Sequence, residues 1–359
     1  MTRITITILI NIFLLSCCIR DMKKDKKKNF FSIISPSSLQ NFKLNDTITF
    51  IIKSLNKNYK IDSINILCNN NNYSIIKSPE NNFKCYINKA KTGLNNIDIL
   101  IYYDNKIETH SLNLVFKSNI IPKNLNYKIV KKYPHNKNSY TQGLLWYNGY
   151  LYESAGRKGM SNLCKIDLRD NEVLKEYKLE NNYFAEGIAL INDKLYQITW
   201  QDKTGFIYDS ENLNLLTKFE YNFNEAWGLT SNNNKFYMSD GSHYIYVIEP
   251  QTFTQIDLIE VYDDKTKIEK LNELEYVCGN ILANVYGESY IVIFDLLGRV
   301  VAKVNFQELI DEKYKNNYDY VLNGIAYNPE NQHFFITGKM WDYIYEVEIP
   351  DFFKLCVPN

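Results

Sequence analysis

A unit of short strands occurs five times in the C-terminal two thirds of the chain, and this repeat restricts the fold more than any other feature. Each unit begins with a glycine position followed by an apolar residue, then an Asn, Gly or Lys turn and a strand rich in Tyr and Phe. Successive glycine positions are 44, 41, 45 and 51 residues apart, because they fall at Gly143, Gly187, Gly228, Glu273 and Gly324. A period of about 40–50 residues made of strands is typical of a β-propeller. Five units predict five blades.

Each unit contains further strands with alternating, aromatic or β-branched residues. In the first unit these are 150–154, 163–167 and 173–177. The fifth unit has no clear fourth strand before the chain ends. Residues 127–131 precede the first unit and have the required pattern, so we expect them to complete the fifth blade. Closing the ring in this way removes sheet edges that favour aggregation.

The residue before each glycine position breaks the symmetry of the repeat. The first strand of a propeller blade lines the central channel, so these five side chains are expected to converge there. A purely structural position tends to keep one residue type, whereas this one holds a carboxyl, an indole and three amides. A hydrated polar channel without a specific function is the alternative. The five residues are Gln142, Glu186, Trp227, Asn272 and Asn323.

The first residues of the chain resemble a bacterial lipoprotein signal. An apolar run over residues 4–15 is short for a membrane span and suits a signal peptide. It leads into Ser16 and Cys17, as in a lipobox, which implies cleavage before Cys17 and its lipidation. An ordinary secretory signal or a short anchor is the alternative. Residues 18–29 then form a basic tether near the membrane of a bacterial cell envelope, facing the periplasm or the cell surface.

Residues 30–118 have a different texture, with about seven short strands separated by Asn, Lys and Pro turns. This pattern predicts an immunoglobulin-like β-sandwich whose binding partner the sequence does not identify. Cys68 and Cys85 form either a disulfide or two free core thiols. Cys164 and Cys278 are expected to be small buried side chains of the propeller.

Composition excludes several functions. The chain has 41 basic and 41 acidic residues, which gives no overall charge for binding nucleic acid. It has no CxxC motif, and its four histidines are scattered. A zinc site, or any other metal or cofactor, is therefore not expected.

Nine motifs between residues 125 and 350 resemble those of the glutamine cyclotransferases of plants and bacteria. In chain order they are TQGL, ESAG, AEGI, LYQITW, AWGL, MSDGS, LNELEYV, LNGIAY and TGKxW. The resemblance implies a five-bladed propeller that converts an N-terminal glutamine of a peptide or protein into pyroglutamate and releases ammonia without a catalytic zinc. It implies Glu186 as acid/base, Gln142 in the channel, and functional roles for Asn272, Asn323, Lys339, Trp200 and Trp227.

Two positions depart from the family pattern. Tyr286 stands where a tryptophan is expected, which affects the fit of the pocket more than catalysis. Residues 134–138 replace a usual His-Asp-Pro sequence and are expected to alter a loop at the rim.

The chemistry of cyclisation agrees with these residue types. Glu186 can accept a proton from the substrate amine and return it to the leaving nitrogen. Lys339 or an amide such as Asn272 can stabilise the oxyanion, and we expect these three to be catalytic. Glu273 and Glu275 are rival carboxyls that we rank lower, and Arg157 and Ser161 are expected at the solvated surface. The substrate-binding set is Gln142, Trp200, Trp227, Tyr286 and Asn323.

The sequence thus predicts an all-β protein with a signal peptide at 1–17, a tether at 18–29, a sandwich at 30–118 and a five-bladed propeller at 119–354. The predicted function is that of a glutaminyl-peptide cyclotransferase. A non-catalytic propeller lipoprotein that binds partners in the envelope is one alternative. A metal-dependent propeller hydrolase is another. It would need several Asp, Asn or Glu ligands near the axis, where the repeat supplies one Glu and two Asn.

Overall fold

The computed structural model describes residues 29–77, 82–87, 90–314 and 317–356. Strands form almost all of its regular structure, so the predicted all-β class is confirmed. The predicted signal peptide, Cys17 and the tether up to residue 28 lie outside the described residues. Within those residues, no helix has the length and apolar character needed to cross a bilayer.

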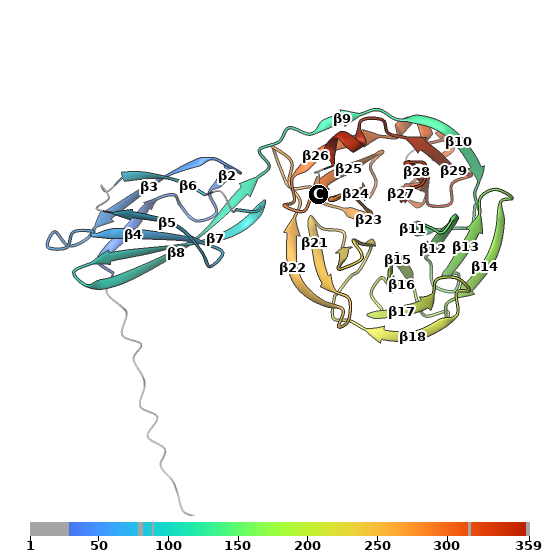
Figure 1. Cartoon of the computed structure of the whole chain (residues 1–359), viewed down its shortest axis with the longest axis horizontal. Helices are drawn as coiled ribbons and strands as arrows, with labels where there is room; N and C mark the ends of the chain where they lie inside the picture. The colour runs from blue at the N-terminus through green and yellow to red at the C-terminus, as the bar shows by residue number, and fades with distance from the viewer. Residues whose placement is uncertain (1–28, 78–81, 88–89, 315–316, 357–359) are drawn as a thin grey trace, which may run out of the picture.

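The N-terminal strands form two sheets that enclose a common core (Figure 1). On β7 buried residues alternate with more exposed ones, and Ile97, Ile99 and Ile101 are completely buried. Strands β2 and β5 were not predicted. The three-stranded sheet contains β1 (Phe31–Ser35), β3 (Thr47–Ser54) and β6 (Asn82–Tyr86). The five-stranded sheet contains β2 (Asn41–Lys43), β8 (Lys106–Lys117), β7 (Gly93–Tyr103), β4 (Ser63–Cys68) and β5 (Asn71–Lys77).

Five further sheets follow, and Figure 1 shows them around a common centre. In the first three, antiparallel strands pair in chain order. The first comprises β11 (Thr141–Tyr147), β12 (Tyr150–Ala155), β13 (Asn162–Asp167) and β14 (Glu172–Lys178). The second comprises β15 (Ala185–Ile191), β16 (Lys194–Thr199), β17 (Thr204–Asp209) and β18 (Leu215–Glu220). The third comprises β19 (Leu229–Ser231), β20 (Phe236–Ser239), β21 (Tyr244–Glu249) and β22 (Thr254–Glu260).

The last two sheets recruit strands from the segment that precedes the repeat. The fourth comprises β23 (Leu271–Val277), β24 (Asn280–Val285), β25 (Tyr290–Asp295), β26 (Val300–Asn305) and β9 (Lys123–Leu125). The fifth comprises β27 (Leu322–Asn328), β28 (His333–Gly338), β29 (Tyr343–Glu348) and β10 (Lys128–Pro134). The pairing of β10 with β29 confirms that residues before the repeat complete the fifth sheet. The parallel pairing of β9 with β26 was not predicted.

The first strands of the five sheets contact one another in a cycle. Strand β11 lies beside β15, β15 beside β19, β19 beside β23, β23 beside β27, and β27 beside β11. Glycine allows this approach: a Cβ on Gly143 would lie 2.8 Å from the backbone nitrogen of Ile188. At Gly228 a Cβ would collide with the carbonyl of Asn272. The repeated glycine therefore lets the inner strands meet closely enough for their side chains to share one site.

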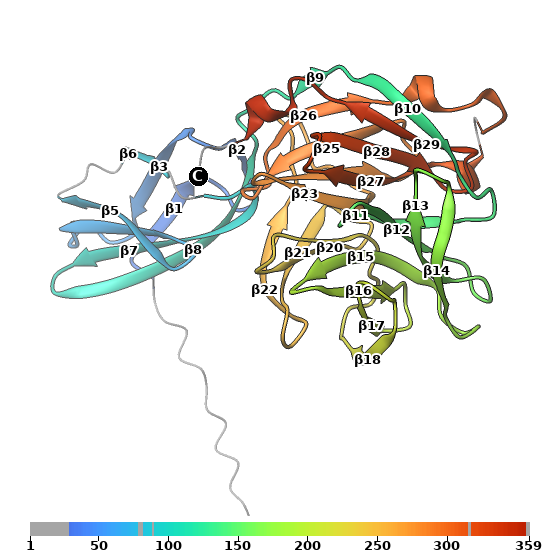
Figure 2. The same cartoon turned by 45° about the vertical axis from the view of Figure 1, so that its right-hand side comes forward.

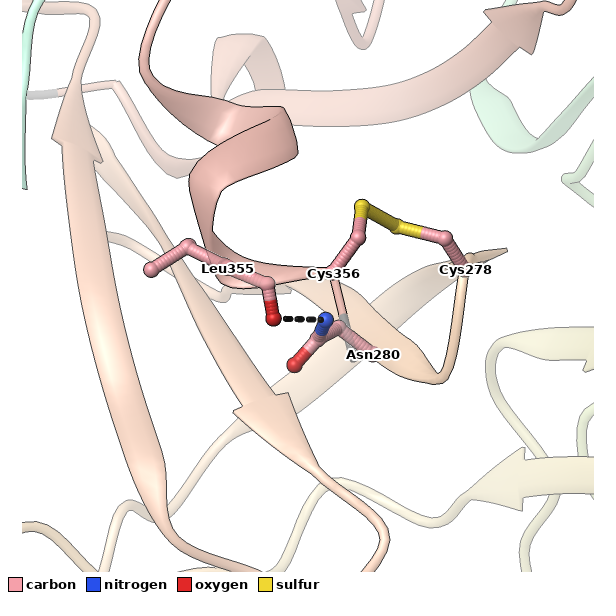
Figure 3. Close-up of a disulfide and its surroundings, with 4 residues drawn as sticks. All are labelled: Cys278, Asn280, Leu355 and Cys356. Carbon is pink, nitrogen blue, oxygen red and sulfur yellow. Dashed lines mark hydrogen bonds between the residues drawn. A yellow bond between two sulfur atoms is a disulfide. The ribbon is translucent and has the colours of Figure 1, made fainter. Parts of the chain in front are cut away.

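The cysteine predictions need a correction at Cys278. It forms a disulfide with Cys356, which joins the turn after β23 to the C-terminal turn of the described chain, with their Cα atoms 5.4 Å apart (Figure 3). A hydrogen bond from Asn280 Nδ2 to the Leu355 carbonyl supports the same junction. Cys68 and Cys85 are both buried and are not joined by a disulfide, so of the two alternatives the structure has two separate core cysteines. Cys164 is a free thiol.

The two N-terminal sheets are joined to the third and fourth of the other sheets by polar contacts, and Figure 2 shows them side by side from a second direction. Thr92 Oγ1 lies 2.6 Å from the carbonyl oxygens of Glu260 and Leu297. Lys91 forms an ion pair with Asp257 at 2.5 Å.

Candidate active site

A cavity of about 280 Å³ lies where the five inner strands begin. Two kinds of segment build it. The starts of the inner strands supply six of its residues, and the turns after β16, β24 and β28 supply Trp200, Tyr286 and Lys339. Every sheet therefore contributes at least one side chain. The other six lining residues are Tyr140, Gln142, Phe184, Glu186, Trp227 and Asn272.

Gln142 links the charged groups of this cavity. Lys339 Nζ donates to Gln142 Oε1 at 2.5 Å, and Gln142 Nε2 donates to Glu186 Oε1 at 2.8 Å. Asn323 Nδ2 also donates to Gln142 Oε1 at 3.2 Å and to the Thr141 carbonyl at 2.9 Å. These contacts fix the orientation of the Gln142 amide, because its oxygen faces two donors and its nitrogen faces a carboxyl.

Two polar atoms in the cavity have no hydrogen-bond partner among the described residues. They are Glu186 Oε2 and Asn272 Oδ1, and the residues that carry them are 4% and 2% exposed. A buried oxygen without a partner costs about 1–3 kcal/mol, so it needs a reason to persist. Both are acceptors, and together they suit a ligand that brings N–H groups into the cavity.

Burial moves the pKa values of the two charged groups toward each other. Loss of water raises the pKa of Glu186 well above its usual range, against the opposing effect of the Lys339 charge. Loss of water also lowers the pKa of Lys339 to about 8, although the Glu186 carboxylate opposes this shift. Both groups can therefore exchange protons nearer to neutral pH than they could in water.

Aromatic rings form the walls. Phe184 contacts Tyr140 and Trp200 edge-on, with ring centroids 6.2 and 5.7 Å apart. Opposite them, Trp227 and Tyr286 meet edge-on at 6.0 Å. Lys339 Nζ lies 4.6 Å from the centroid of the Tyr140 ring and 5.4 Å from that of Tyr286, which stabilises its positive charge in this apolar setting.

Most of the predicted site residues meet in this cavity, and one does not. Asn323 lies behind Gln142 and is not among the lining residues, so its contact is with another side chain of the site. Tyr140 and Phe184 line the cavity but were not predicted. Each lies two residues before a predicted side chain, Gln142 or Glu186, and alternation along an extended segment places such residues on the same side. The predicted residues that line the cavity are Gln142, Glu186, Trp200, Trp227, Asn272, Tyr286 and Lys339.

The rival carboxyls lie further along the inner strands. Glu273 Oε2 accepts from the backbone nitrogen of Ile325 at 2.8 Å, and its Oε1 faces the nitrogen of Leu144 at 3.3 Å. Glu275 Oε1 accepts from the nitrogen of Tyr327 at 2.8 Å. Neither lines the cavity.

The residues expected at the rim differ in exposure, and Ser161 does not lie at the solvated surface as expected. Residues 136–138 are exposed, but His135 is buried, with Nε2 2.9 Å from Glu153 Oε1. Ser161 is buried as well: its hydroxyl donates to the Arg157 carbonyl and accepts from the Ala185 nitrogen. Arg157 is half-buried, stacks on Tyr140 and forms an ion pair with Asp319 at 3.0 Å. His135, Ser161 and Arg157 can be buried or half-buried because neighbouring residues supply their hydrogen-bond or ionic partners.

The chemistry of the donor set around the cavity is that of amides, one carboxyl and one amine. Across the described parts of the chain, no three His, Cys, Asp or Glu side chains are grouped so that they could hold a metal ion. The predicted catalytic and substrate-binding roles concern the carboxyl, amine and amide side chains of this site.

Comparison with known proteins covers the five-sheet part of the chain. The sequence model of the family described as glutamine cyclotransferase matches residues 107–349. The glutaminyl-peptide cyclotransferase of Arabidopsis thaliana is 34% identical over 228 residues, which are 62% of this chain and 71% of that protein. The crystal structure of Myxococcus xanthus glutaminyl cyclase is 31% identical and superposes with a TM-score of 0.59, covering 63% of this chain and 97% of that one.

Proposed function

The chain belongs to the glutamine cyclotransferase family, and we propose that it converts the N-terminal glutamine of a peptide or protein into pyroglutamate and releases ammonia. One observation carries this proposal. Glu186, Gln142 and Lys339 are linked by hydrogen bonds inside a small aromatic cavity, and Glu186 Oε2 has no partner among the described residues. The cavity thus offers a proton acceptor, a cation and amide groups to a single carboxamide.

The reaction forms one bond and breaks another. The α-nitrogen of the substrate attacks its own γ-carboxamide carbon, and the γ-nitrogen leaves as ammonia. Glu186 Oε2 accepts the proton that the attacking nitrogen loses and returns it to the leaving nitrogen. Its raised pKa suits both steps near neutral pH. General acid–base catalysis of this kind typically raises a reaction rate by about 10²–10⁴-fold.

The other groups bind and stabilise. Asn272 Oδ1 accepts an N–H of the α-amine, which brings the amine toward the carboxamide. Lys339, held by Gln142, places its positive charge where the carbonyl oxygen becomes an oxyanion. The rings of Phe184, Trp200 and Trp227 exclude water, which strengthens these electrostatic effects. Asn323 acts through Gln142, whose amide it orients.

Incubation of the purified protein with peptides that begin with glutamine tests the proposal. We expect ammonia in solution and a peptide product that has lost the mass of ammonia. Peptides with an acetylated α-nitrogen should be inert, because their nitrogen cannot attack. If a broad panel of glutaminyl peptides stays intact, the proposal is wrong and the cavity binds a ligand without turnover.

The fold implied by these elements is a five-bladed β-propeller over residues 119–354, preceded by an immunoglobulin-like sandwich over 30–118. The cyclic contacts of the inner strands and the pairing of β10 with β29 support the propeller. Two sheets around one core support the sandwich. A crystal structure in which the five sheets do not surround one axis would overturn this assignment.

We also propose that lipid attached to Cys17 anchors the protein to a membrane of the bacterial envelope. The apolar run of residues 4–15 followed by Ser16 and Cys17 supports this. Metabolic labelling with a fatty acid should mark the wild type and not the Cys17→Ala variant, which should be released from the membrane fraction. Equal labelling of both proteins would contradict the proposal.

A further inference from the structure

A second cavity, of about 470 Å³, opens on the same side of the molecule as the first. Its walls are the turn between β24 and β25 and described residues of the connection from β26 to β27. These are the same two kinds of segment that build the first cavity. The described residues that line it are Gly287, Glu288, Ser289, Gln307, Ile310, Tyr314, Asn317, Tyr320, Val321 and Leu322.

The second cavity exists because one repeat is longer than the others. The glycine positions of the fourth and fifth units are 51 residues apart, against 41 to 45 for the other pairs. The additional residues form the short 3-10 helices η1 (Gln307–Leu309), η2 (Glu312–Tyr314) and η3 (Tyr318–Tyr320). All three contribute to the wall or to its support. The feature is therefore specific to one unit and is not required by the repeat.

The two cavities share a wall. Tyr286 lines the first cavity, and the next residue, Gly287, lines the second. The backbone nitrogen of Lys339 donates to the carbonyl of Val321 at 2.9 Å, which joins a residue of the first cavity to one of the second. A peptide whose first side chain fills the first cavity therefore needs only a short step to reach the second, since an extended chain advances about 3.3–3.6 Å per residue.

We propose that the second cavity binds the residues that follow the N-terminal glutamine of the substrate, and that Glu288 there favours a basic side chain. This inference rests on the proposed function. The first cavity is small and walled by aromatic rings, so it accommodates the cyclising residue while the rest of the peptide leaves over its rim. The shared wall places the second cavity directly beside the first.

Charge and ring chemistry give the preference for a cation. Glu288 is exposed, and it is the single charged side chain among the described residues that line the cavity. Tyr314 and Tyr320 stack with centroids 4.9 Å apart, and Tyr320 is the more exposed of the two. A Lys or Arg side chain can contact the Glu288 carboxylate while its stem or charge lies on the Tyr320 ring.

Matched peptides test this inference. One series carries Lys at the second, third or fourth position after an N-terminal Gln, and a second carries Glu there, with Ala elsewhere. Ammonia release gives kcat/KM for each peptide, relative to glutaminamide, which has no following residue. At low salt we expect the better Lys peptide to exceed its Glu counterpart by about 3–10-fold in the wild type. High salt should reduce the ratio.

Charge reversal makes the test specific. Glu288→Lys should invert the ratio, and Glu288→Gln should bring it near one. Glu172→Lys, the same charge change at an exposed position on an outer strand, should leave the wild-type ratio. A Lys-to-Glu ratio of one at every position in the wild type would overturn the inference, as would a ratio that Glu288→Lys leaves unchanged.

Equilibrium binding separates this inference from the proposed function. Calorimetry with the same peptides on the Glu186→Gln variant, whose turnover is expected to be slow, gives their Kd values and should show the same order of preference. Absence of ammonia release from all peptides and from glutaminamide would reject the proposed function. Equal affinities for the Lys and Glu peptides would reject the role of the second cavity, whether or not ammonia is released.

Discussion

Two carboxyls lie on the inner strands of the same ring, and their surroundings differ. Burial raises the pKa of both Glu186 and Glu273 well above the usual range. Glu273 faces the backbone nitrogens of Leu144 and Ile325, so both of its oxygens have partners. Glu186 has one oxygen on Gln142 and one without a partner among the described residues. Burial and a raised pKa are therefore common to both carboxyls, and the oxygen without a partner is the feature that separates Glu186 from Glu273.

The positions of their partners show that the two carboxyls lie at different depths. Leu144 lies two residues after Gln142, and Ile325 lies two residues after Asn323. Glu273 therefore contacts the inner strands two residues further from the cavity than those side chains do. Glu273 also stands where the other four units have glycine. Its side chain joins three inner strands, because it belongs to β23 and faces the backbone nitrogens of Leu144 on β11 and Ile325 on β27. The two carboxyls thus lie at successive positions along the inner strands, one beside the cavity and one beyond it.

The largest expected effect comes from Glu186→Gln. The amide keeps the hydrogen bond of Gln142 within reach but cannot accept the proton of the amine, so kcat should fall by about 10²–10⁴-fold. The thermal midpoint should stay or rise, because a buried ionisable group has been removed. Ammonia release and thermal unfolding measure both. Glu273→Gln is the matched control and should keep the wild-type turnover per folded molecule; the reverse pattern would exchange the roles of the two carboxyls.

Lys339→Met tests the proposed role of the cation beside the cavity. Loss of the cation beside the oxyanion should reduce kcat by about 10²–10³-fold. In the wild type kcat/KM should fall as pH rises through about 8, because the pKa of Lys339 is about 8 and the charged form exists below it. Lys339→Arg should move that limb to higher pH, since a guanidinium stays charged. An alkaline limb that stays in place in Lys339→Arg would exclude Lys339 as its source.

Glu273→Leu tests whether the carboxyl beyond the cavity stabilises the fold. The substitution leaves the nitrogens of Leu144 and Ile325 without an acceptor, at about 1–3 kcal/mol each, partly offset because no carboxyl is buried. We expect a lower free energy of unfolding in denaturant titrations and a normal kcat for the folded fraction. A stable Glu273→Leu protein without activity would show that the lower carboxyl takes part in catalysis.

The smallest effect for each step measured is a pH dependence of stability from Glu275, counted per pH unit. Burial raises its pKa to about 8. The folded state thus keeps a proton that the unfolded state has already lost, and its contribution to stability is complete below the unfolded pKa. That contribution falls by about 1.4 kcal/mol for each pH unit up to about 8. Glu275→Gln should reduce the slope of the free energy of unfolding against pH by this amount, while Glu186 and Glu273 continue to contribute. An unchanged slope would assign it to other groups.

Sequence reasoning found the features that local pattern encodes. The strands of each unit follow from alternation, and the closing strand β10 follows from a unit that lacks one. Tyr140 and Phe184 could have been found in the same way, because each lies two residues before a predicted side chain. Asn323 was predicted from its repeat position, but its contact with Gln142 depends on how two neighbouring first strands pack.

The features that sequence reasoning missed depend on contacts between distant segments. Cys278 and Cys356 are 78 residues apart, and nothing near either cysteine indicates the other. Strand β9 has three residues, too few for a periodic pattern, and it pairs with β26 far along the chain. His135 is buried because Glu153 and the Trp341 carbonyl meet its two ring nitrogens, and both partners come from other strands or turns.

The hydrogen bond between Lys339 and Gln142 spans 197 residues and joins the last sheet of the ring to the first. A ribosome therefore produces Gln142 and Glu186 long before the cation that completes their site. A polypeptide that stops short of Lys339 carries the carboxyl without its counter-charge, and it also lacks the strand on which β10 must pair. The proposed site is therefore complete only after Lys339 has been added, and we expect a chain that stops before this residue to be inactive toward N-terminal glutamine.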